Sequence, residues 1–395
     1  MRVAIDCSHH LIPGGIRTHI GNLLEAITAE EPANDYVLFY RGRHRPRELP
    51  AVAAGAAVET LFQRVPRRLM SYLENSVGWP PVERWRGGLD VFHGTHFTLP
   101  VTRNARSILT VHDATYLRHP ELYGHRKLND HCYRYLLPRS LERADLVLAI
   151  SLSTRNDLVE LCGVDEERIW VVPNGLDPRV RPLPREERGP VLERLGIRRP
   201  FVLYPAGTID RRKNIDNALR AFARAFPRKA ARPLLFLTGV GELPRRYAEL
   251  VLRLGLEQDV MMRKVGYPDE LIALMSGALW GMYLSLYEGF GLPPLEGMAC
   301  GLPMLVSDAS SIPEVTGDAA LLADPRDVDA LAAAMERLHA GDDLRRDLRR
   351  RGRERAAEPA FGWRRAARQT LAAYRLDRAA YEAEPQPLAE AIHQF

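Results

Sequence analysis

The sequence predicts an α/β protein of two domains, each built on a parallel sheet that is covered by helices on both faces. Short apolar segments typical of buried strands alternate with helical segments along the chain. This alternation starts again after a segment rich in proline and charge. The chain has 395 residues, of which 46% are hydrophobic and 27% are charged, which is sufficient for two hydrophobic cores.

The predicted strands of the first half are short and apolar, as expected for strands between two helical layers. They span residues 3–7, 36–40, 91–94, 107–112, 146–150 and 170–172. Helical segments at residues 16–28 and 127–143 lie between some of them. The second half continues the same pattern. Its predicted strands span residues 201–205, 234–237, 261–265, 281–287 and 303–307.

The boundary between the two predicted domains lies in the proline-rich segment Pro178-Arg179-Val180-Arg181-Pro182-Leu183-Pro184. The charged run that follows it to about Gly189 is also typical of a linker. We therefore predict an N-terminal domain over residues 1–183 and a C-terminal domain over residues 184–360.

The segment Glu288-Gly289-Phe290-Gly291-Leu292-Pro293-Pro294-Leu295-Glu296 is the most informative for function. It follows a predicted buried strand and leads into a predicted helix at residues 293–300. The turn therefore lies at the carboxyl end of a strand, where open α/β sheets bind ligands.

The amides around Phe290, Gly291 and Leu292 are expected to point outward at the start of that helix, where they favour phosphate or sugar oxygens. Glu296 can accept two hydrogen bonds from a vicinal diol such as a ribose, and Glu288 faces the same crevice. Alternatively, Glu296 only complements the helix dipole and Glu288 is a solvated charge. Both glutamates together around Gly-Phe-Gly favour the ligand-binding interpretation.

At this point the chain resembles the family-4 retaining glycosyltransferases, which move a sugar from a nucleotide donor to an acceptor hydroxyl. The matching signature is the pair of glutamates separated by seven residues, with Gly289-Phe290-Gly291-Leu292-Pro293 between them. The resemblance continues through residues 297–303, 311–315 and 317–320, and it is collinear over almost the whole chain.

This resemblance implies the GT-B fold, in which two Rossmann-like domains have parallel sheets that face an interdomain cleft. The N-terminal domain would bind the acceptor and the C-terminal domain the nucleotide sugar. The last helix, in residues 361–395, would cross back to the N-terminal domain, with Trp363 as a packing anchor. The resemblance also implies retention of configuration and places Glu288 among the catalytic residues.

Two strand ends of the N-terminal domain carry further candidate residues. The turn after the first strand contains Gly14 and Gly15, which would let backbone amides approach an anion, although such a turn is more often only flexible. Another strand ends at His112 and Asp113, and a single histidine is usually structural. The resemblance implies that the two glycines lie near the donor pyrophosphate and the acceptor, that His112 touches the transferred sugar, and that Asp113 helps to position it.

The C-terminal domain begins with a strand, a glycine turn at Gly207 and Thr208, and the cations Arg212 and Lys213 at a helix start. Cations there oppose the helix dipole, so a diphosphate is a natural partner, and a solvated basic turn is the alternative. The resemblance implies that both cations neutralise the leaving nucleotide. Many relatives have an arginine where this chain has Thr208, so the phosphate role depends on Arg212 and Lys213.

We predict an enzyme that needs neither metal nor cofactor, because no aspartate cluster suggesting a divalent-metal site stands beside these motifs in the sequence. Preorganised charge would stabilise the departing diphosphate instead. The nucleobase is expected to be read by backbone and loop groups near Val265, Gly266 and Tyr267.

The run at residues 111–121 and the Arg-Arg-Lys-Asn turn at residues 211–214 look most like bacterial mannosyltransferases that build surface polysaccharides. We therefore expect transfer of mannose from GDP-mannose to a glycan or a lipid-linked saccharide, with UDP-glucose or another nucleotide hexose as the alternative donor. Three rival functions are a nucleotide-sugar epimerase of the same fold, a non-catalytic binding protein and a nucleic-acid glucosyltransferase.

The formal net charge of +5 leaves the partner open. Residues 62–73 mix basic and apolar side chains, as expected of a surface that touches anionic lipid or an acidic acceptor. Nucleic acid is disfavoured, because no recognised binding module accompanies the charge. The uncharged stretch at residues 271–287 approaches the length of a membrane span, but serine and glycine interrupt it.

The location expected from the sequence is the cytoplasm, with peripheral contact at the inner face of the plasma membrane as an open alternative. The chain begins directly with a strand and shows no signal segment. Its cysteines are widely scattered and form no metal-type pair, as in a reduced protein. They are Cys7, Cys132, Cys162 and Cys300. The oligomeric state stays open.

Overall fold

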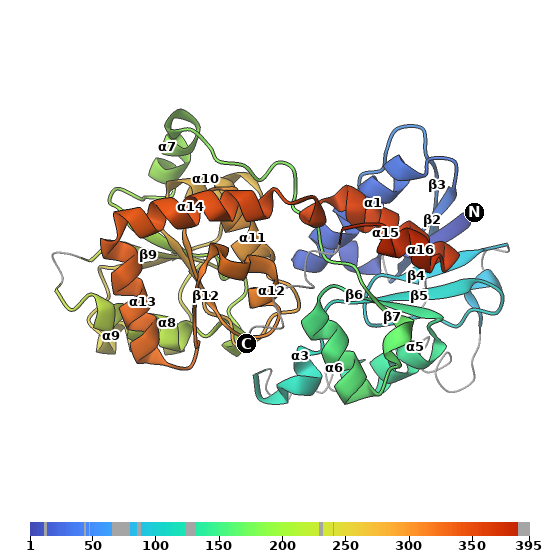
Figure 1. Ribbon diagram of the computed structural model, residues 1–395, viewed down its shortest axis with the longest axis horizontal. Coiled ribbons are helices and arrows are strands. Elements are labelled where there is room, and N and C mark those ends of the chain that lie inside the picture. Colours follow the sequence, from blue (N-terminus) through green and yellow to red (C-terminus); the bar gives the residue numbers. More distant parts are fainter. Residues whose placement is uncertain are drawn as a thin grey trace. The chain divides into compact units, whose positions relative to one another are not determined.

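The computed structural model describes residues 1–11, 14–42, 45–46, 48–64, 80–84, 88–122, 132–228, 232–239 and 241–385. The chain forms two compact units (Figure 1). The first unit comprises Met1–Gly175 together with the segment that starts at Pro359, and the second comprises Leu176–Glu358. Both units are α/β, and each is described by itself below.

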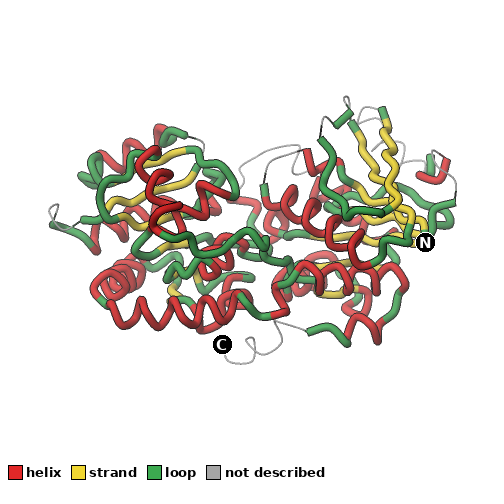
Figure 2. The backbone as a smooth tube through the Cα atoms, turned by 90° about the horizontal axis from the view of Figure 1, so that it is seen from above, coloured by secondary structure: helices red, strands yellow, loops and turns green. Residues whose placement is uncertain are grey.

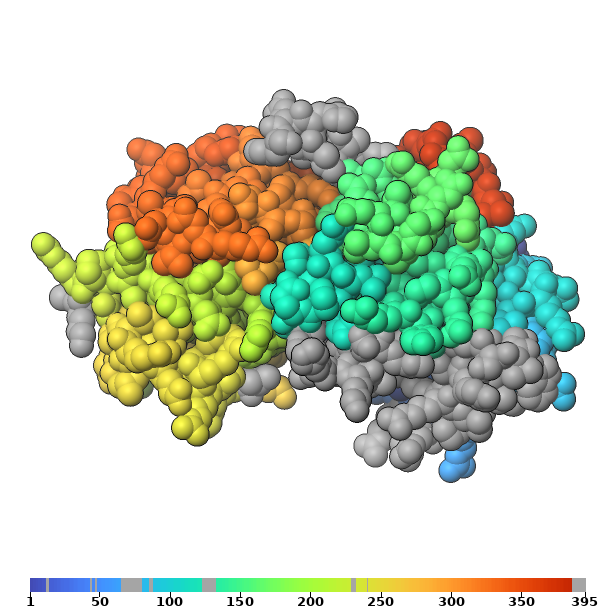
Figure 3. All heavy atoms as spheres, turned by 90° about the horizontal axis from the view of Figure 1, so that it is seen from below, coloured from blue at the N-terminus to red at the C-terminus, as the bar shows by residue number. Residues whose placement is uncertain are grey.

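The first unit contains a seven-stranded sheet in the order β3-β2-β1-β4-β5-β6-β7, in which all neighbouring strands are parallel. The strands are β1 (Arg2–Asp6), β2 (Asp35–Arg41), β3 (Ala57–Gln63), β4 (Val91–Gly94), β5 (Arg106–Val111), β6 (Leu146–Ala149) and β7 (Ile169–Val171). The helices are α1 (Gly15–Glu30), α3 (Thr115–Arg118), α5 (Leu137–Arg143), α6 (Leu152–Cys162), α15 (Trp363–Arg375) and α16 (Arg378–Glu382). Figure 3 shows a face of the molecule on which residues of α6 (green) lie at the surface.

The second unit contains a six-stranded parallel sheet in the order β10-β9-β8-β11-β12-β13. The strands are β8 (Phe201–Tyr204), β9 (Leu234–Thr238), β10 (Val260–Arg263), β11 (Gly281–Tyr283), β12 (Met304–Ser307) and β13 (Leu321–Ala323). The helices are α7 (Arg185–Arg194), α8 (Ile215–Ala225), α9 (Arg245–Arg253), α10 (Asp269–Gly277), α11 (Leu292–Ala299), α12 (Ile312–Thr316), α13 (Val328–Ala340) and α14 (Asp342–Ala356). Figure 2 shows helices beside the strands in both units.

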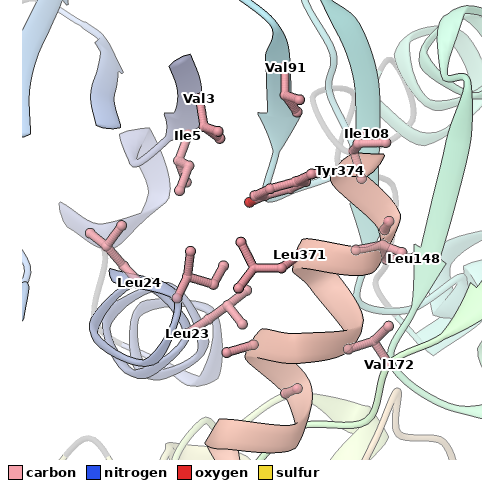
Figure 4. Packing of buried hydrophobic residues seen from close by; sticks show 14 of the residues in the cluster. Val3, Ile5, Leu23, Leu24, Val91, Ile108, Leu148, Val172, Leu371 and Tyr374 are labelled. Atoms are coloured by element: carbon pink, nitrogen blue, oxygen red, sulfur yellow. The ribbon is translucent and has the colours of Figure 1, made fainter. Parts of the chain in front are cut away.

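The C-terminal helix α15 belongs to the first unit, which confirms the predicted return of the chain. It packs beside α1 and covers one face of the sheet (Figure 4). Leu371 and Tyr374 of this helix lie in the same buried cluster as Val3, Ile5 and Leu24. Trp363 joins this cluster and is 8% exposed, as expected of a packing residue.

Both sheets have a switch point, where the strand order reverses. It lies between β1 and β4 in the first unit and between β8 and β11 in the second. Open α/β sheets bind ligands outside the carboxyl ends of the strands at such points. The fold therefore places the loops after β8 and β11 where a ligand is expected.

Some elements differ from the sequence prediction. The strand predicted at residues 281–287 ends at Tyr283, because the next residues turn their amides toward other partners. Leu284 N donates to the Tyr204 hydroxyl over 3.3 Å, and Leu286 N donates to the Arg212 carbonyl over 2.8 Å. The charged run predicted as a linker forms α7, which has acidic residues in its first turn and Arg194 in its last, as the helix dipole favours.

Two strands, β3 and β13, were not predicted. Part of the helix predicted at residues 127–143 and most of the basic segment at residues 62–73 lie outside the described residues. The part of the first that is described forms a π-helical turn at Cys132–Leu136, followed by α5. None of the helices in the described part of the chain has the length and apolar character needed to span a bilayer.

Candidate active site

The candidate site of the second unit begins where two neighbouring strands end. The turn after β8 carries a 3₁₀ helix at Arg211–Lys213, and the loop after β11 carries Glu288. The hydrogen bond from Leu286 N to the Arg212 carbonyl joins these two connections. Lys213 and Glu288 are therefore held close together although 75 residues separate them in the sequence.

Glu288 binds both predicted cations. Its Oε1 lies 2.7 Å from Lys213 Nζ, and its Oε2 pairs with the Arg212 guanidinium. The Tyr283 hydroxyl donates to Glu288 Oε1 over 2.9 Å and also lies 2.5 Å from Lys213 Nζ. Lys213 and Glu288 are buried, with exposed fractions of 5% and 8%. We call Arg212, Lys213, Tyr283 and Glu288 the cationic cluster.

Charge in the cationic cluster keeps Glu288 ionised. Burial would raise the pKa of this carboxyl, but Arg212 and Lys213 outweigh burial and lower the pKa to about 2. The Lys213 ammonium has three N–H groups and bonds two acceptors, the Glu288 carboxylate and the Tyr283 hydroxyl. The cluster is therefore preorganised, and it retains donor capacity for an anionic ligand.

The loop that carries Glu288 is fixed by two serines that follow β12. Glu288 N donates to Ser310 Oγ over 2.8 Å. Ser311 Oγ lies 2.9 Å from the Glu288 carbonyl and 2.7 Å from the Phe290 carbonyl. Ser311 is fully buried, so these contacts are sheltered from water.

Gly291 ends this loop in a conformation that favours glycine, with φ of 117°. A Cβ atom there would lie 2.9 Å from Ile312 Cδ1. The next residue, Leu292, begins α11, which carries Glu296 on its buried face. The predicted helix start after Gly-Phe-Gly is thus confirmed, and the glycine is required by both conformation and space.

The glycine turn after β8 is also as predicted, and its threonine bonds to the turn that follows. Gly207 has φ of 67°, and its amide donates to Thr238 Oγ1 over 3.2 Å. Thr208 Oγ1 donates to Asp210 Oδ2 over 3.0 Å. Since Thr208 bonds Asp210 at the entrance to the 3₁₀ turn, it stabilises the turn that presents Arg212.

Glu296 is bonded to a residue of the loop after β10 and not to the cationic cluster. The Tyr267 hydroxyl donates to Glu296 Oε1 over 3.0 Å. Burial raises the pKa of Glu296 to about 7, and the negative charge of Asp177 adds to the rise while Tyr267 opposes it. Glu296 can thus accept further hydrogen bonds when it is ionised, and its pKa lies close to neutral pH.

The rest of the predicted nucleobase loop is ordered by α10. Gly266 N donates to Glu270 Oε2 over 2.6 Å, and Glu270 also pairs with Arg194 at 2.9 Å. The Gly266 amide is therefore bound within the loop, while Val265 is partly buried and Tyr267 is 44% exposed. This arrangement favours Tyr267 over Gly266 as the group that meets a ligand.

In the first unit, His112 follows β5 and is bonded to the loop after β4. Its Nε2 lies 2.8 Å from the Thr95 carbonyl, which can only accept, so Nε2 carries the hydrogen and Nδ1 keeps a lone pair. Its ring contacts the His19 ring of α1 edge to face at 4.7 Å. Burial lowers the pKa of His112, so the imidazole is neutral near pH 7.

Asp113 and the glycine pair have local structural roles in the first unit. Asp113 Oδ1 accepts the Thr115 amide over 3.0 Å and so orders the start of α3. Gly14 precedes α1 with φ of 143°, and a Cβ atom on Gly14 or Gly15 would meet no atom of the described residues within 4 Å. The anion-binding role of this turn stays a prediction.

The predicted residues thus fall into two groups, one in each unit. In the second unit the structure brings together Arg212, Lys213 and Glu288, and it pairs Tyr267 with Glu296. Sequence reasoning missed the residues that hold these groups, the negative charge that acts on Glu296, and the partners of His112. The first are Tyr283, Ser310 and Ser311, the second is Asp177, and the last are Thr95 and His19. Within the described ranges, no group of three or more His, Cys, Asp or Glu side chains is arranged to hold a metal ion.

Two family models match the chain, one in each half. Residues 13–180 match the model described as Glycosyltransferase Family 4, and residues 193–355 match the one described as Glycosyl transferases group 1. The chain is also similar to the O-antigen chain mannosyltransferase B of Escherichia coli. The two are 34% identical over 295 residues, which cover 72% of this chain and 74% of that relative.

Solved structures share the fold. Sucrose-phosphate synthase from Thermosynechococcus elongatus superposes with a TM-score of 0.73 at 24% identity, covering 96% of this chain and 100% of that one. HepE from Anabaena, solved in complex with UDP-glucose, superposes with a TM-score of 0.69 at 16% identity, covering 94% and 100%. The family models, the E. coli relative and the two parallel sheets agree, and the chain belongs to the family-4 glycosyltransferases and has the GT-B fold.

Proposed function

We propose that this protein is a retaining, metal-independent hexosyltransferase that moves mannose from GDP-mannose to a glycan or lipid-linked saccharide in surface-polysaccharide synthesis. The cationic cluster is the observation that carries this proposal. It places a buried lysine and an arginine at the switch point of the second sheet, where a nucleotide is expected.

The chemistry follows from the charges that develop during transfer. The bond between the anomeric carbon and the diphosphate oxygen breaks, and its electron pair leaves with the nucleoside diphosphate. Arg212 and Lys213 stabilise that negative charge without reorganisation, because Glu288 and Tyr283 already hold them in place. The acceptor oxygen attacks the anomeric carbon on the face that the diphosphate leaves, and the proton of the acceptor hydroxyl passes to an oxygen of the departing diphosphate.

Other residues would bind the remaining parts of the donor. Glu296 accepts hydrogen bonds from the ribose diol, since its buried carboxylate has acceptor capacity. His112 is neutral and presents Nδ1 as an acceptor for a hydroxyl of the transferred sugar. The choice of mannose rests on the similarity to an O-antigen chain mannosyltransferase, and a lipid-linked acceptor would bring the enzyme to a membrane surface.

A panel of nucleotide sugars in a thermal-shift assay tests the donor directly, because a ligand that binds only the folded state raises the unfolding temperature. GDP-mannose and GDP are expected to give the largest shifts in unfolding temperature. A separate activity assay should then detect transfer of mannose to a saccharide acceptor. UDP-glucose is the rival donor, as HepE was solved with it. A shift with UDP-glucose alone would overturn the GDP-mannose assignment, and conversion of the sugar without any acceptor would indicate an epimerase.

A further inference from the structure

His19 lies on α1, and a buried hydrogen bond orients its ring. Its Nδ1 lies 2.7 Å from Asn174 Oδ1. That amide oxygen can only accept, so Nδ1 carries the hydrogen and Nε2 keeps a lone pair. Nε2 is buried and has no hydrogen-bond partner among the described residues, and His19 as a whole is 3% exposed. The orientation of the ring is therefore set at Asn174.

The His19 ring also contacts two other rings. It meets the His112 ring edge to face, with the centroids 4.7 Å apart and the planes at 89°. It meets the Trp363 ring edge to face as well, with the centroids 5.8 Å apart. Burial lowers the pKa of both histidines, so both rings are neutral near pH 7 and do not repel each other.

The two anchors of His19 lie where the chain leaves the first unit and where it returns. Asn174 directly precedes Gly175, the last residue of the unit's main segment. Trp363 lies shortly after Pro359, where the returning segment starts. Both anchors are buried, with exposed fractions of 4% and 8%. They therefore fix the His19 ring without involving the histidine that is proposed to bind the sugar.

His112 is bonded at the far end of its ring. Its Nε2 donates to the Thr95 carbonyl over 2.8 Å, and Nδ1 is the acceptor proposed for a hydroxyl of the transferred sugar. The bond at Nε2 fixes the tautomer, but rotation about χ2 still moves Nδ1. The His19 ring restricts this rotation, because it packs perpendicular to the His112 ring in close contact.

We propose that His19 is a positioning residue whose ring keeps Nδ1 of His112 directed at the transferred sugar. This inference rests on the proposed function, because it takes His112 as a ligand of that sugar. The hydrogen bond to Asn174 orients the His19 ring, and the ring in turn holds the rotamer of His112. Since Nε2 of His19 is bonded to no described residue, the ring surface is the part that acts.

Two substitutions separate the ring of His19 from its hydrogen bond. His19→Asn keeps an N–H that can donate to Asn174 but removes the ring, whereas His19→Phe keeps the ring and removes the donor. The assay is consumption of GDP-mannose with methyl α-mannoside as the acceptor. His19→Asn should lower kcat/KM about tenfold, because a misplaced contact to the reacting sugar raises the barrier, and His19→Phe should lower it less, about threefold. Both variants should bind GDP as the wild type does, because GDP carries no sugar.

The His112→Ala background shows whether His19 acts through His112. There His19→Asn should cause no further loss of kcat/KM, since the residue that it positions is already absent. An unchanged kcat/KM in His19→Asn, or an equal loss in both backgrounds, would overturn the proposal. Losses that follow the unfolding temperatures of the two His19 variants would also overturn it, because a merely structural histidine has that effect.

Failure of the proposed function gives a different result. If the wild type consumes neither GDP-mannose nor UDP-glucose, the proposed function is wrong, and this inference falls with it. If the wild type is active and His112→Ala transfers the sugar normally, the hexosyltransferase assignment stands and the positioning role of His19 is excluded.

Discussion

Glu288 and Glu296 are both buried, yet their surroundings give them opposite proton affinities. Arg212 and Lys213 lower the pKa of Glu288 to about 2, so this residue is ionised at neutral pH. Burial raises the pKa of Glu296 to about 7, and a hydrogen bond from Tyr267 offsets only part of the rise. The first glutamate is a fixed charge, whereas the second changes its protonation state near neutral pH.

Donor affinity should therefore depend on pH through Glu296. Above pH 7 the ionised carboxylate accepts from the ribose, and as the pH falls through about 7 the added proton removes acceptor capacity, so binding weakens. Glu296→Gln should cost about 1.5–3 kcal/mol of GDP binding at pH 8 and should flatten the profile. Calorimetry from pH 6 to 8.5 measures both. An equally steep profile in the variant would assign the dependence to another group.

Lys213 is expected to matter for turnover. Lys213→Ala should lower the rate of donor consumption about a hundredfold or more, the usual scale for a preorganised charge-stabilising group. Arg245→Ala is a suitable control, because that side chain in α9 is 94% exposed and should leave the rate unchanged. Steady-state kinetics with a thermal-unfolding check provide the measurement. Normal turnover in Lys213→Ala would exclude the cluster as the diphosphate site.

At the scale of elements, Gly175 packs closely against the start of α15. Gly175 ends the segment Met1–Gly175, and α15 is the helix that returns to the first unit. A Cβ atom on Gly175 would lie 2.5 Å from both the backbone nitrogen and Cγ of Trp363. Trp363 begins α15 and packs in the same cluster as Leu371. The glycine therefore allows α15 to lie directly against the chain where it leaves this unit.

Gly175→Ala should consequently destabilise the protein by about 1–3 kcal/mol, since the methyl group overpacks the site. Gly21→Ala is the matched control, because a Cβ there would make only ordinary contact, 3.6 Å from His10 Nε2, and the residue lies inside α1. That control should gain about 0.5–1 kcal/mol. Urea unfolding of both variants tests the pair. Equal stability of the two variants would show that α15 moves aside freely.

Sequence patterns predicted most of these elements but not the contacts between them. Apolar runs identified the buried strands, whereas β3, with its partly exposed residues, and the three-residue β13 gave no such signal. The pairing of Lys213 with Glu288 could be predicted from the sequence, because both residues follow strands of one sheet. The contacts of Tyr267 and Asp177 could not be predicted, since they depend on how separate loops meet in three dimensions. No local spacing in the sequence encodes that.

On the scale of the whole molecule, the two units carry different parts of the proposed reaction. The side chains proposed to bind the diphosphate and the ribose lie in Leu176–Glu358, whereas His112 and the glycine turn at Gly14 and Gly15 lie in the first unit. Each unit has its own parallel sheet and switch point. Binding of the nucleotide and handling of the transferred sugar are therefore expected to be separable by mutation.

His112→Ala tests this separation. It should leave the dissociation constant for GDP unchanged within about twofold, because GDP carries no sugar, while kcat/KM for transfer falls about ten- to hundredfold from the lost acceptor. Glu296→Gln provides the opposite pattern, with weaker GDP binding. A parallel loss of GDP affinity in His112→Ala would place the histidine at the nucleotide instead.

The return of α15 to the first unit also sets the order in which the protein can mature on the ribosome. Domains usually fold as they emerge, the N-terminal one first. Here the core around Val3, Ile5 and Leu24 lacks Leu371 and Tyr374 until α15 has been translated. Tyr374 also supplies the hydroxyl that bonds His93 Nδ1 at 2.8 Å. The first unit can therefore be completed only after the segment Leu176–Glu358 has been synthesised and α15 has emerged.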